Sequence, residues 1–270
     1  MQSNITPYNP TMRLRLLPTV LITFLLISNL SCTDKKTSLQ PDTDVAHLQK
    51  DFITWWNYQS NSIRLAGNFN PLDENSEVIS KEEFLQKLIS GKFIPIHLKS
   101  DDKKSYYKLY KISPEAPISI NQTIKTNAIT ELKFYKMEGA EFPGFNWTDL
   151  QGKNYTKKNT KGNILVIKCW FINCYACIKE FPDLNQLVNN YKERNDIEFI
   201  SLALDGEDDL KEFLKKNDFN YQVVPDQGDF LKNDLKIRYY PTHFIIDKQG
   251  KVLKVVTNFE DLNEAMKYDL

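Results

Sequence analysis

The stretch "WFINCYACIKEFP", Trp170–Pro182, decides the fold of this chain, because it joins an apolar segment to a helical one and carries two of the four cysteines. Cys174 and Cys177 are separated by two residues. This spacing serves thiol–disulfide exchange, zinc binding and haem attachment alike. The surrounding sequence and the cellular compartment are therefore needed to choose among these kinds of site.

The sequence around the cysteine pair alternates between patterns typical of strands and of helices. Apolar runs rich in β-formers predict strands, and apolar residues at helical spacing predict helices. The expected strands are ILVIKCWF (164–171), IEFISLAL (197–204), THFIID (242–247) and KVLKVV (251–256), and the expected helices are IKEFPDLNQLVNNYKE (178–193) and DDLKEFLKKND (208–218). This order predicts an α/β fold with some parallel pairing, in which ligands bind at the carboxyl ends of the strands. Cys174 follows the first strand and is expected at that edge.

The composition excludes two classes of partner. The chain of 270 residues has 35 basic and 35 acidic side chains, and no long run of one sign. Neither a nucleic-acid-binding face nor a basic membrane-coating face is therefore indicated. Proteins or small molecules are the expected partners, and the length favours two domains.

The beginning of the chain resembles an export signal. Arg13 and Arg15 precede the apolar run LLPTVLITFLLISNL (16–30), which is short for a membrane span. Cys32 follows the small residue Ser31, as in a bacterial lipoprotein signal, in which the cysteine becomes the lipidated first residue. The alternative is an ordinary signal peptide cleaved near Ser31. Either predicts an oxidising compartment, and lipidation predicts anchoring to a membrane on the periplasmic side of the cell envelope.

The chain is predicted to contain two folded parts behind its leader. The signal peptide, residues 1–31, is followed by a polar stretch, 32–44, which we expect to be a flexible tether. Residues 45–135 form a small α+β module in which no chemistry is apparent, and residues 136–270 contain the cysteine pair and the α/β pattern.

The α+β module carries one clear helix signal. Ser80 and Glu83 form a capping box ahead of an apolar helical run, and Gly91 is expected to end that helix. Residues 106–112, YYKLYKI, alternate like a strand. We expect residues 114–135 to form further extended segments.

The position of Cys174 favours a reactive thiolate. Asn173 is expected to cap a helix that begins at Cys174, so that the thiol faces unpaired backbone N–H groups and the positive end of the helix dipole. Cysteines in such positions have pKa values of roughly 3.5 to 7.5, against about 8.5 for a free thiol. Cys177 lies one turn further on, where it can close a disulfide and release a mixed disulfide formed at Cys174.

Taken with its neighbours, this stretch resembles the active site of the thioredoxin superfamily. Residues from about Glu138 to Leu270 resemble the exported TlpA/ResA-type thiol-disulfide oxidoreductases of that superfamily. Trp170 stands where the family has a strand-end tryptophan, and Pro182 matches the proline that kinks the active-site helix. GAEFPGFNWTDLQGKNY (139–155) resembles the hairpin that opens these domains.

A second motif supports the same resemblance. YYPTHFIIDKQGKVLKVV (239–256) resembles the signature P-T-x-F-x-I-D-x-x-G-K, in which the proline is cis and packs beside the cysteines. Pro241 and Thr242 occupy the first two positions. The resemblance implies a thioredoxin-like C-terminal domain with a central mixed sheet flanked by helices.

The resemblance also implies an activity. Cys174 would attack a substrate disulfide and Cys177 would resolve the mixed disulfide, so that protein disulfides are reduced without a cofactor. A membrane dithiol would supply the electrons, and the lipid anchor would hold the protein at that membrane. Tyr175 and Ala176 replace the family's proline-containing dipeptides, which help to set the reduction potential, so the direction of electron flow is left open.

Three charged residues are candidates to support the cysteines. Lys168, six residues before Cys174, occupies the position of the buried acid of thioredoxins. Its ammonium either favours the Cys177 thiolate or snorkels out of the core. TlpA-like proteins often carry an acid after the next strand, for which Asp205 and Glu207 are the candidates, and Glu207 is chosen as the supporting residue.

The cysteine pair has alternative interpretations as a staple or a metal site. A disulfide across one helical turn closes almost no loop and stabilises little. Zinc would need two further ligands, and haem attachment would need a histidine where Ile178 stands. Copper delivery stays open, because His243 lies near the expected site, although a histidine there is expected to face solvent or the opposite side of its strand.

A thiol peroxidase is the remaining enzyme alternative. Peroxiredoxins have a threonine three residues before the reactive cysteine, where this chain has Phe171. Cys169, on the strand, is expected to be a small buried hydrophobe, with a regulatory thiol as the alternative. Tyr239 and Tyr240 are either packing residues or part of a groove for a substrate peptide.

Overall fold

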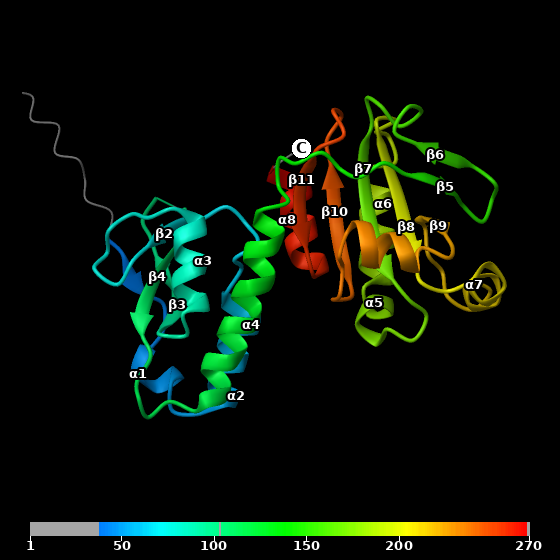
Figure 1. Cartoon of the computed structure of the whole chain (residues 1–270). Helices are drawn as coiled ribbons and strands as arrows, with labels where there is room; N and C mark the ends of the chain where they lie inside the picture. Colours follow the sequence, from blue (N-terminus) through cyan, green and yellow to red (C-terminus); the bar gives the residue numbers. More distant parts are fainter. Residues whose placement is uncertain (1–37, 103, 269–270) are drawn as a thin grey trace, which may run out of the picture. The chain divides into compact units, whose positions relative to one another are not determined.

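Two sheets, each with its own apolar core, account for most strands among residues 38–102 and 104–268, the part of the chain that this computed structural model describes (Figure 1). The predicted signal peptide, Cys32 and the first residues of the predicted tether lie outside that part.

The first sheet has four strands in the order β1-β3-β4-β2, and four helices belong to the same region of the chain. The strands are β1 (Gln40–Pro41), β2 (Asn70–Leu72), β3 (Phe93–Lys99) and β4 (Tyr106–Lys111), and the helices are α1 (Val45–Leu48), α2 (Phe52–Ser62), α3 (Lys81–Ile89) and α4 (Ile118–Tyr135). Their buried side chains form one cluster, in which Trp55, Phe84 and Leu109 are fully enclosed. This region is therefore the α+β module that the sequence predicts.

The second sheet has five strands in the order β11-β10-β7-β8-β9. Its strands are β7 (Ile164–Trp170), β8 (Ile197–Ala203), β9 (Gln222–Val224), β10 (Thr242–Ile246) and β11 (Val252–Val256). The hairpin strands are β5 (Asn146–Thr148) and β6 (Asn154–Thr156), and the helical segments are α5 (Tyr175–Lys179), α6 (Phe181–Asn190), α7 (Glu207–Leu214), the π-turn η1 (Phe230–Asp234) and α8 (Phe259–Tyr268).

Strand β7 is the central strand of this sheet, and both of its faces are covered. All seven of its residues are buried. It pairs in parallel with β8 and antiparallel with β10. A continuous apolar run without alternation is typical of such a strand. Side chains from α6 and α8 pack on one face of the sheet, and those from the β5–β6 hairpin and η1 pack on the other. These features confirm the predicted thioredoxin-like fold.

The expectation of extended segments over residues 114–135 is wrong, since Ile118–Tyr135 form the helix α4. Pro117 precedes its first turn. Ile120, Ile124 and Ala128 recur every four residues and are buried on one face, where α4 packs against α3 and β3. The β-branched side chains favour a strand locally, but burial of this stripe outweighs that weak propensity.

The predicted tether is also wrong for its last residues. Gln40 and Pro41 pair with Lys99 and Leu98 at the edge of β3. The carboxylate of Asp42 accepts a hydrogen bond from the Tyr58 hydroxyl at 2.8 Å and lies 3.0 Å from Nδ1 of His97. The polar composition of this segment did not predict these contacts, because strand pairing uses backbone groups and does not require apolar side chains.

The predicted N-cap of α3 is confirmed at Ser80 and generates the first prediction. Ser80 is the N-cap, and its Oγ accepts the Glu83 N–H at 3.1 Å. Gly91 follows the helix with φ of 72°, the left-handed conformation that ends helices. Replacement Ser80→Ala is expected to lower the free energy of unfolding by about 1 kcal/mol, because one N–H of the first turn loses its partner. Urea unfolding followed by circular dichroism measures this loss.

Ser60→Ala is the matched control for this experiment. Ser60 lies exposed within α2 rather than at a cap, so alanine there removes no capping bond and slightly favours the helix. Equal urea midpoints for the two variants would contradict the capping role of Ser80.

Candidate active site

The two cysteines of the C-x-x-C motif are joined in a disulfide at the carboxyl end of β7. The two sulfurs differ in access, since Cys174 is 7% exposed and Cys177 is fully buried. An incoming thiol or disulfide can therefore reach only the first sulfur. This asymmetry is the one that thiol exchange through an attacking and a resolving cysteine requires.

The start of the active-site helix differs by one residue from the prediction. Helix α5 begins at Tyr175, and its N-cap is Cys174 rather than Asn173. Sγ of Cys174 accepts the N–H of Cys177 at 3.2 Å, which is the bond that an N-cap side chain makes to the third helical residue. In the reduced protein the same N–H would stabilise negative charge on this sulfur.

Trp170 is the last residue of β7, as expected, and belongs to the same apolar cluster as Cys174 and Cys177. Its buried ring packs against Phe181, Phe213 and Phe219, with ring centroids 5.1 to 5.8 Å apart. The helix is interrupted at Glu180, and Pro182 stands in the first turn of α6. The aromatic cluster thus holds the end of β7 against α6 and α7.

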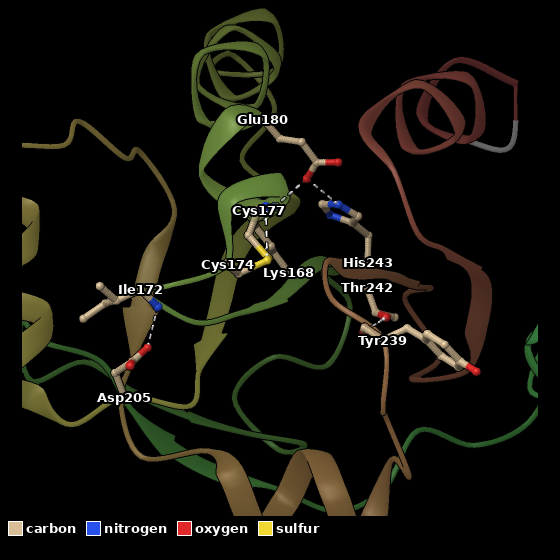
Figure 2. Close-up of a disulfide and its surroundings, with 9 residues drawn as sticks. All are labelled: Lys168, Ile172, Cys174, Cys177, Glu180, Asp205, Tyr239, Thr242 and His243. Carbon is tan, nitrogen blue, oxygen red and sulfur yellow. Dashed lines mark hydrogen bonds and ion pairs between the residues drawn. A yellow bond between two sulfur atoms is a disulfide. The ribbon is translucent and has the colours of Figure 1, made fainter. Parts of the chain in front are cut away.

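The peptide bond between Tyr240 and Pro241 is cis, which confirms that part of the prediction. Strand β10 begins next, with Thr242 opposite Cys169 of β7, so the proline loop lies at the same sheet edge as the disulfide (Figure 2). The Thr242 hydroxyl donates to the Tyr239 carbonyl at 2.7 Å.

The two tyrosines before Pro241 have different roles. The ring of Tyr240 packs edge-on against Phe171 at 5.5 Å between centroids. Tyr239 is 48% exposed, as expected of a residue that could contact a substrate peptide. The structure therefore favours a packing role for Tyr240, whereas Tyr239 is open to contact with a partner.

Lys168 does not snorkel to solvent, because it lies in the middle of the central strand. Its side chain is fully buried, and its Nζ lies 2.6 Å from Oε2 of Glu180. Burial lowers the pKa of the Lys168 ammonium from its ordinary value, and the Glu180 carboxylate opposes this shift. A buried lysine–glutamate pair thus occupies the position of the single acid found in thioredoxins.

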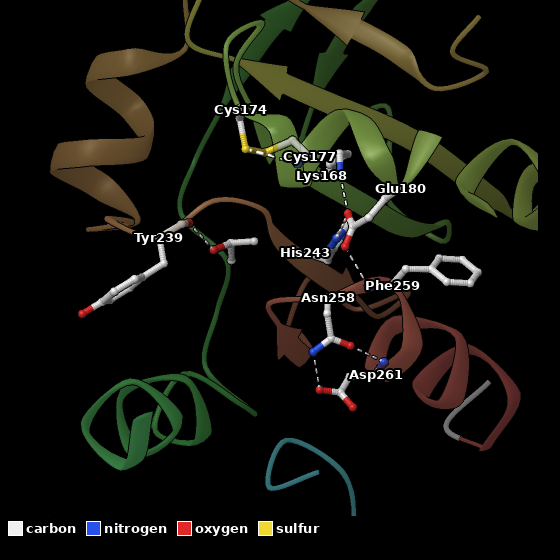
Figure 3. Close-up of polar contacts among 10 residues, drawn as sticks. Lys168, Cys174, Cys177, Glu180, Tyr239, His243, Asn258, Phe259 and Asp261 are labelled. Carbon is white, nitrogen blue, oxygen red and sulfur yellow. Dashed lines mark hydrogen bonds and ion pairs between the residues drawn. A yellow bond between two sulfur atoms is a disulfide. The ribbon is translucent and has the colours of Figure 1, made fainter. Parts of the chain in front are cut away.

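Glu180 is the functional candidate that the sequence reasoning missed. Its Oε2 also lies 3.1 Å from Nε2 of His243, and its Oε1 accepts the Phe259 N–H at 2.9 Å (Figure 3). Burial raises the pKa of this carboxyl, but the His243 hydrogen bond and the charge of Lys168 outweigh burial, so the net pKa is below the ordinary value. The sequence did contain a clue to this residue, because Glu180 is an acid that follows Cys177 by three residues and directly precedes an apolar helical run.

The two acids after β8 occupy different surroundings. Oδ2 of Asp205 accepts the Ile172 N–H at 2.7 Å and so holds the loop before Cys174. Glu207, which was chosen as the supporting residue, lies exposed in the first turn of α7 and pairs with Lys211. Of the two candidate acids, it is therefore Asp205 and not Glu207 that contacts the loop before Cys174.

Neither Cys169 nor His243 is open to solvent. Cys169 is buried in the core, which confirms it as a small hydrophobe, and burial raises the pKa of its thiol. His243 is fully buried rather than solvent-facing, and its Nε2 contacts Glu180. Over residues 38–102 and 104–268, no group of three or more His, Cys, Asp or Glu side chains is arranged to hold a metal ion.

Comparison with known proteins agrees with this geometry. The family model described as "AhpC/TSA family" matches residues 139–255. The thiol-disulfide oxidoreductase ResA of Bacillus cereus is 36% identical over 135 residues, which cover 49% of this chain and 78% of that protein. ResA of Bacillus subtilis is 30% identical over 145 residues, which cover 53% of this chain and 79% of that protein.

Solved structures also resemble this part of the chain. The exposed lipoprotein thioredoxin Etrx1 of Streptococcus pneumoniae is 26% identical, covers 47% of this chain and 100% of its own, and has a TM-score of 0.42. The thioredoxin domain of a thiol-disulfide oxidoreductase from Bacteroides vulgatus is 22% identical, covers 48% and 95%, and has a TM-score of 0.44. The identity to ResA over more than three quarters of its length shows that this chain belongs to the ResA family of thiol-disulfide oxidoreductases.

Proposed function

We propose that this thiol-disulfide oxidoreductase is exported and reduces protein disulfides through the dithiol of Cys174 and Cys177. The difference in access between the two sulfurs carries the proposal, since only Cys174 can meet a protein substrate. The cis-proline loop at the same sheet edge as the disulfide, and the exposed Tyr239 in that loop, support a protein substrate rather than a small peroxide.

The reaction proceeds by two exchanges at sulfur. The Cys174 thiolate attacks one sulfur of the substrate disulfide, and the other substrate sulfur leaves as a thiolate that takes a proton. Cys177 then loses its proton and attacks Sγ of Cys174, which releases the second substrate thiol. Two electrons pass to the substrate, and the protein is left with the Cys174–Cys177 disulfide seen in the structure.

Return to the dithiol requires an electron donor outside this chain. We assign that role to a dithiol of a membrane protein, because the sequence indicates a lipid anchor at Cys32 that would hold the domain near the membrane. Within residues 38–102 and 104–268, no helix is both long enough and apolar enough to span a bilayer. The proposed lipid anchor and periplasmic location rest on the leader sequence and Cys32.

Two cysteine variants test the reaction. Cys174→Ser is expected to abolish insulin reduction, since the buried Cys177 cannot reach a substrate. Cys177→Ser is expected to accumulate mixed disulfides at Cys174, visible by non-reducing electrophoresis and mass spectrometry. Cys169→Ser serves as the control and should leave the rate of insulin reduction within about twofold, because this thiol is buried in the core. Full activity of Cys174→Ser would refute the proposed function.

A third variant tests the anchor. Cys32→Ala is expected to move the protein from the membrane fraction to the soluble periplasmic fraction, because an acylated Cys32 would supply the hydrophobic attachment. The measurement is fractionation with immunoblotting, joined to mass spectrometry of the mature N-terminus. Unchanged membrane association and an N-terminus without lipid mass would count against lipidation.

A further inference from the structure

A row of polar side chains crosses the apolar face of the five-stranded sheet. His243 of β10, Lys168 of β7 and Ser201 of β8 are register partners on adjacent strands, and all three are fully buried. The layers on either side are apolar, with Val166 in one and Trp170 in the other. The polar row is therefore one layer away from Trp170.

Glu180 contacts two members of this row, Lys168 and His243. Its Oε2 lies 2.6 Å from Nζ of Lys168 and 3.1 Å from Nε2 of His243. Nδ1 of His243 and Oγ of Ser201 have no hydrogen-bond partner among the described residues. Buried polar groups are costly unless fully paired, and apolar residues would fill a sheet core at lower cost. Stability therefore does not explain the row, and such clusters are candidates for a functional role.

The cluster lies beside the resolving cysteine. Both close-up views place the Lys168 side chain next to Cys177, with Glu180 and His243 beyond it (Figures 2 and 3). Cys177 is fully buried, so the proton that it loses before attacking Cys174 cannot pass directly to bulk water. The thiolate formed there also needs a nearby positive charge, because burial disfavours an isolated anion.

The groups that face His243 come from several elements. Lys168 of β7 and Glu180 before α6 are the charges that act on it. Strand β11 presents the apolar Val256 as its register partner, and α8 directs the Phe259 N–H to the same carboxylate. The buried hydroxyl of Tyr221, before β9, is influenced by Glu180. Burial and the charge of Lys168 lower the pKa of His243, and its contact with Glu180 opposes that shift. Nδ1 of His243 has no hydrogen-bond partner among the described residues, so it is the ring atom at which a proton can be added.

We propose that Lys168 and His243 are positioning residues that set the acidity of Cys177 through their shared contact with Glu180. With a Cys177 thiol, the charges of Lys168 and Glu180 cancel. When Cys177 loses its proton, a second anion joins the cluster, and His243 takes up one proton to restore the balance. The inference rests on the proposed function, because it concerns the resolving step of that reaction.

The step balances in atoms and electrons. The proton leaves Sγ of Cys177 and is matched by one gained at the His243 imidazole. The Sγ electron pair of Cys177 then forms the bond to Sγ of Cys174 while the bond from Cys174 to the substrate sulfur breaks. The substrate leaves as a thiolate and is protonated as His243 returns to the neutral form.

The test titrates Cys177 in a Cys32→Ala, Cys174→Ser background, by thiolate absorbance at 240 nm. Adding Lys168→Met is expected to lower the thiolate fraction at a fixed pH below the midpoint at least tenfold, which is a rise of one unit or more in the Cys177 pKa. Adding His243→Gln keeps a side-chain N–H donor but removes the imidazole that takes up a proton. With His243 present, the Cys177 titration is expected to extend over two steps, and in the His243→Gln variant it should become a single step. Cys169 does not interfere, because burial raises the pKa of its thiol.

Lys153→Met is the matched control. Lys153 forms an ion pair with Glu198 at the same 2.6 Å, but its side chain is 57% exposed and it lies on the β6 side of the domain. It should leave the Cys177 titration unchanged. If Lys168→Met leaves Glu180 unpaired and the protein does not fold, the pair Lys168→Met with Glu180→Gln removes both charges, and the Cys177 pKa is still expected to rise.

The outcomes separate this inference from the proposed function. Unchanged Cys177 titrations in the Lys168 and His243 variants would overturn the inference, even when the wild-type protein reduces insulin normally. A shift in Lys153→Met as large as that in Lys168→Met would overturn it as well. If the wild type does not reduce insulin but the titrations shift as expected, the proposed direction of the reaction is rejected. The inferred effect of Lys168 and His243 on the acidity of Cys177 then still holds.

Discussion

The carboxylate of Glu180 connects three segments of the domain that carries the cysteine pair. It contacts Lys168 of the central strand, His243 of the strand that follows the cis-proline loop, and the first backbone N–H of α8. Three segments that are distant in sequence thus meet at one side chain at the break between α5 and α6. Cys177 lies one turn before that break, so the carboxylate joins the end of the cysteine helix to the strand that follows the proline loop.

A buried charged cluster of this kind contributes little to the free energy of folding, because its charges must be removed from water. Replacing a buried ion pair by apolar residues of similar volume is often neutral or stabilising by about 1–4 kcal/mol, whereas removing one partner costs about 3–5 kcal/mol. The surrounding core is apolar, with Trp170 packed on Phe181 and Phe219. Apolar packing stabilises this region, and the proposed role of the charged cluster is in the acidity of Cys177.

The N-terminal module follows a simpler logic. Its helices and its four-stranded sheet enclose one apolar cluster, and α3 begins and ends where Ser80 and Gly91 require. The local signals in that helix were sufficient because a cap and a left-handed glycine act within one turn. They were insufficient for α4, where β-branched side chains at four-residue intervals are stabilised by packing rather than by propensity.

The sequence by itself determined the strand–helix alternation around the cysteine pair, the strand-end position of Trp170 and the cis-proline motif, because each depends on neighbouring residues or on a motif of fixed spacing. The tertiary structure alone decided that Lys168 is buried and paired, that Glu180 is its partner, and that His243 joins them. These contacts follow from the antiparallel register of β10 against β7, which places residue 243 opposite residue 168. Pairing register is a non-local property, because it is set by the packing of both sheet faces and not by either strand alone.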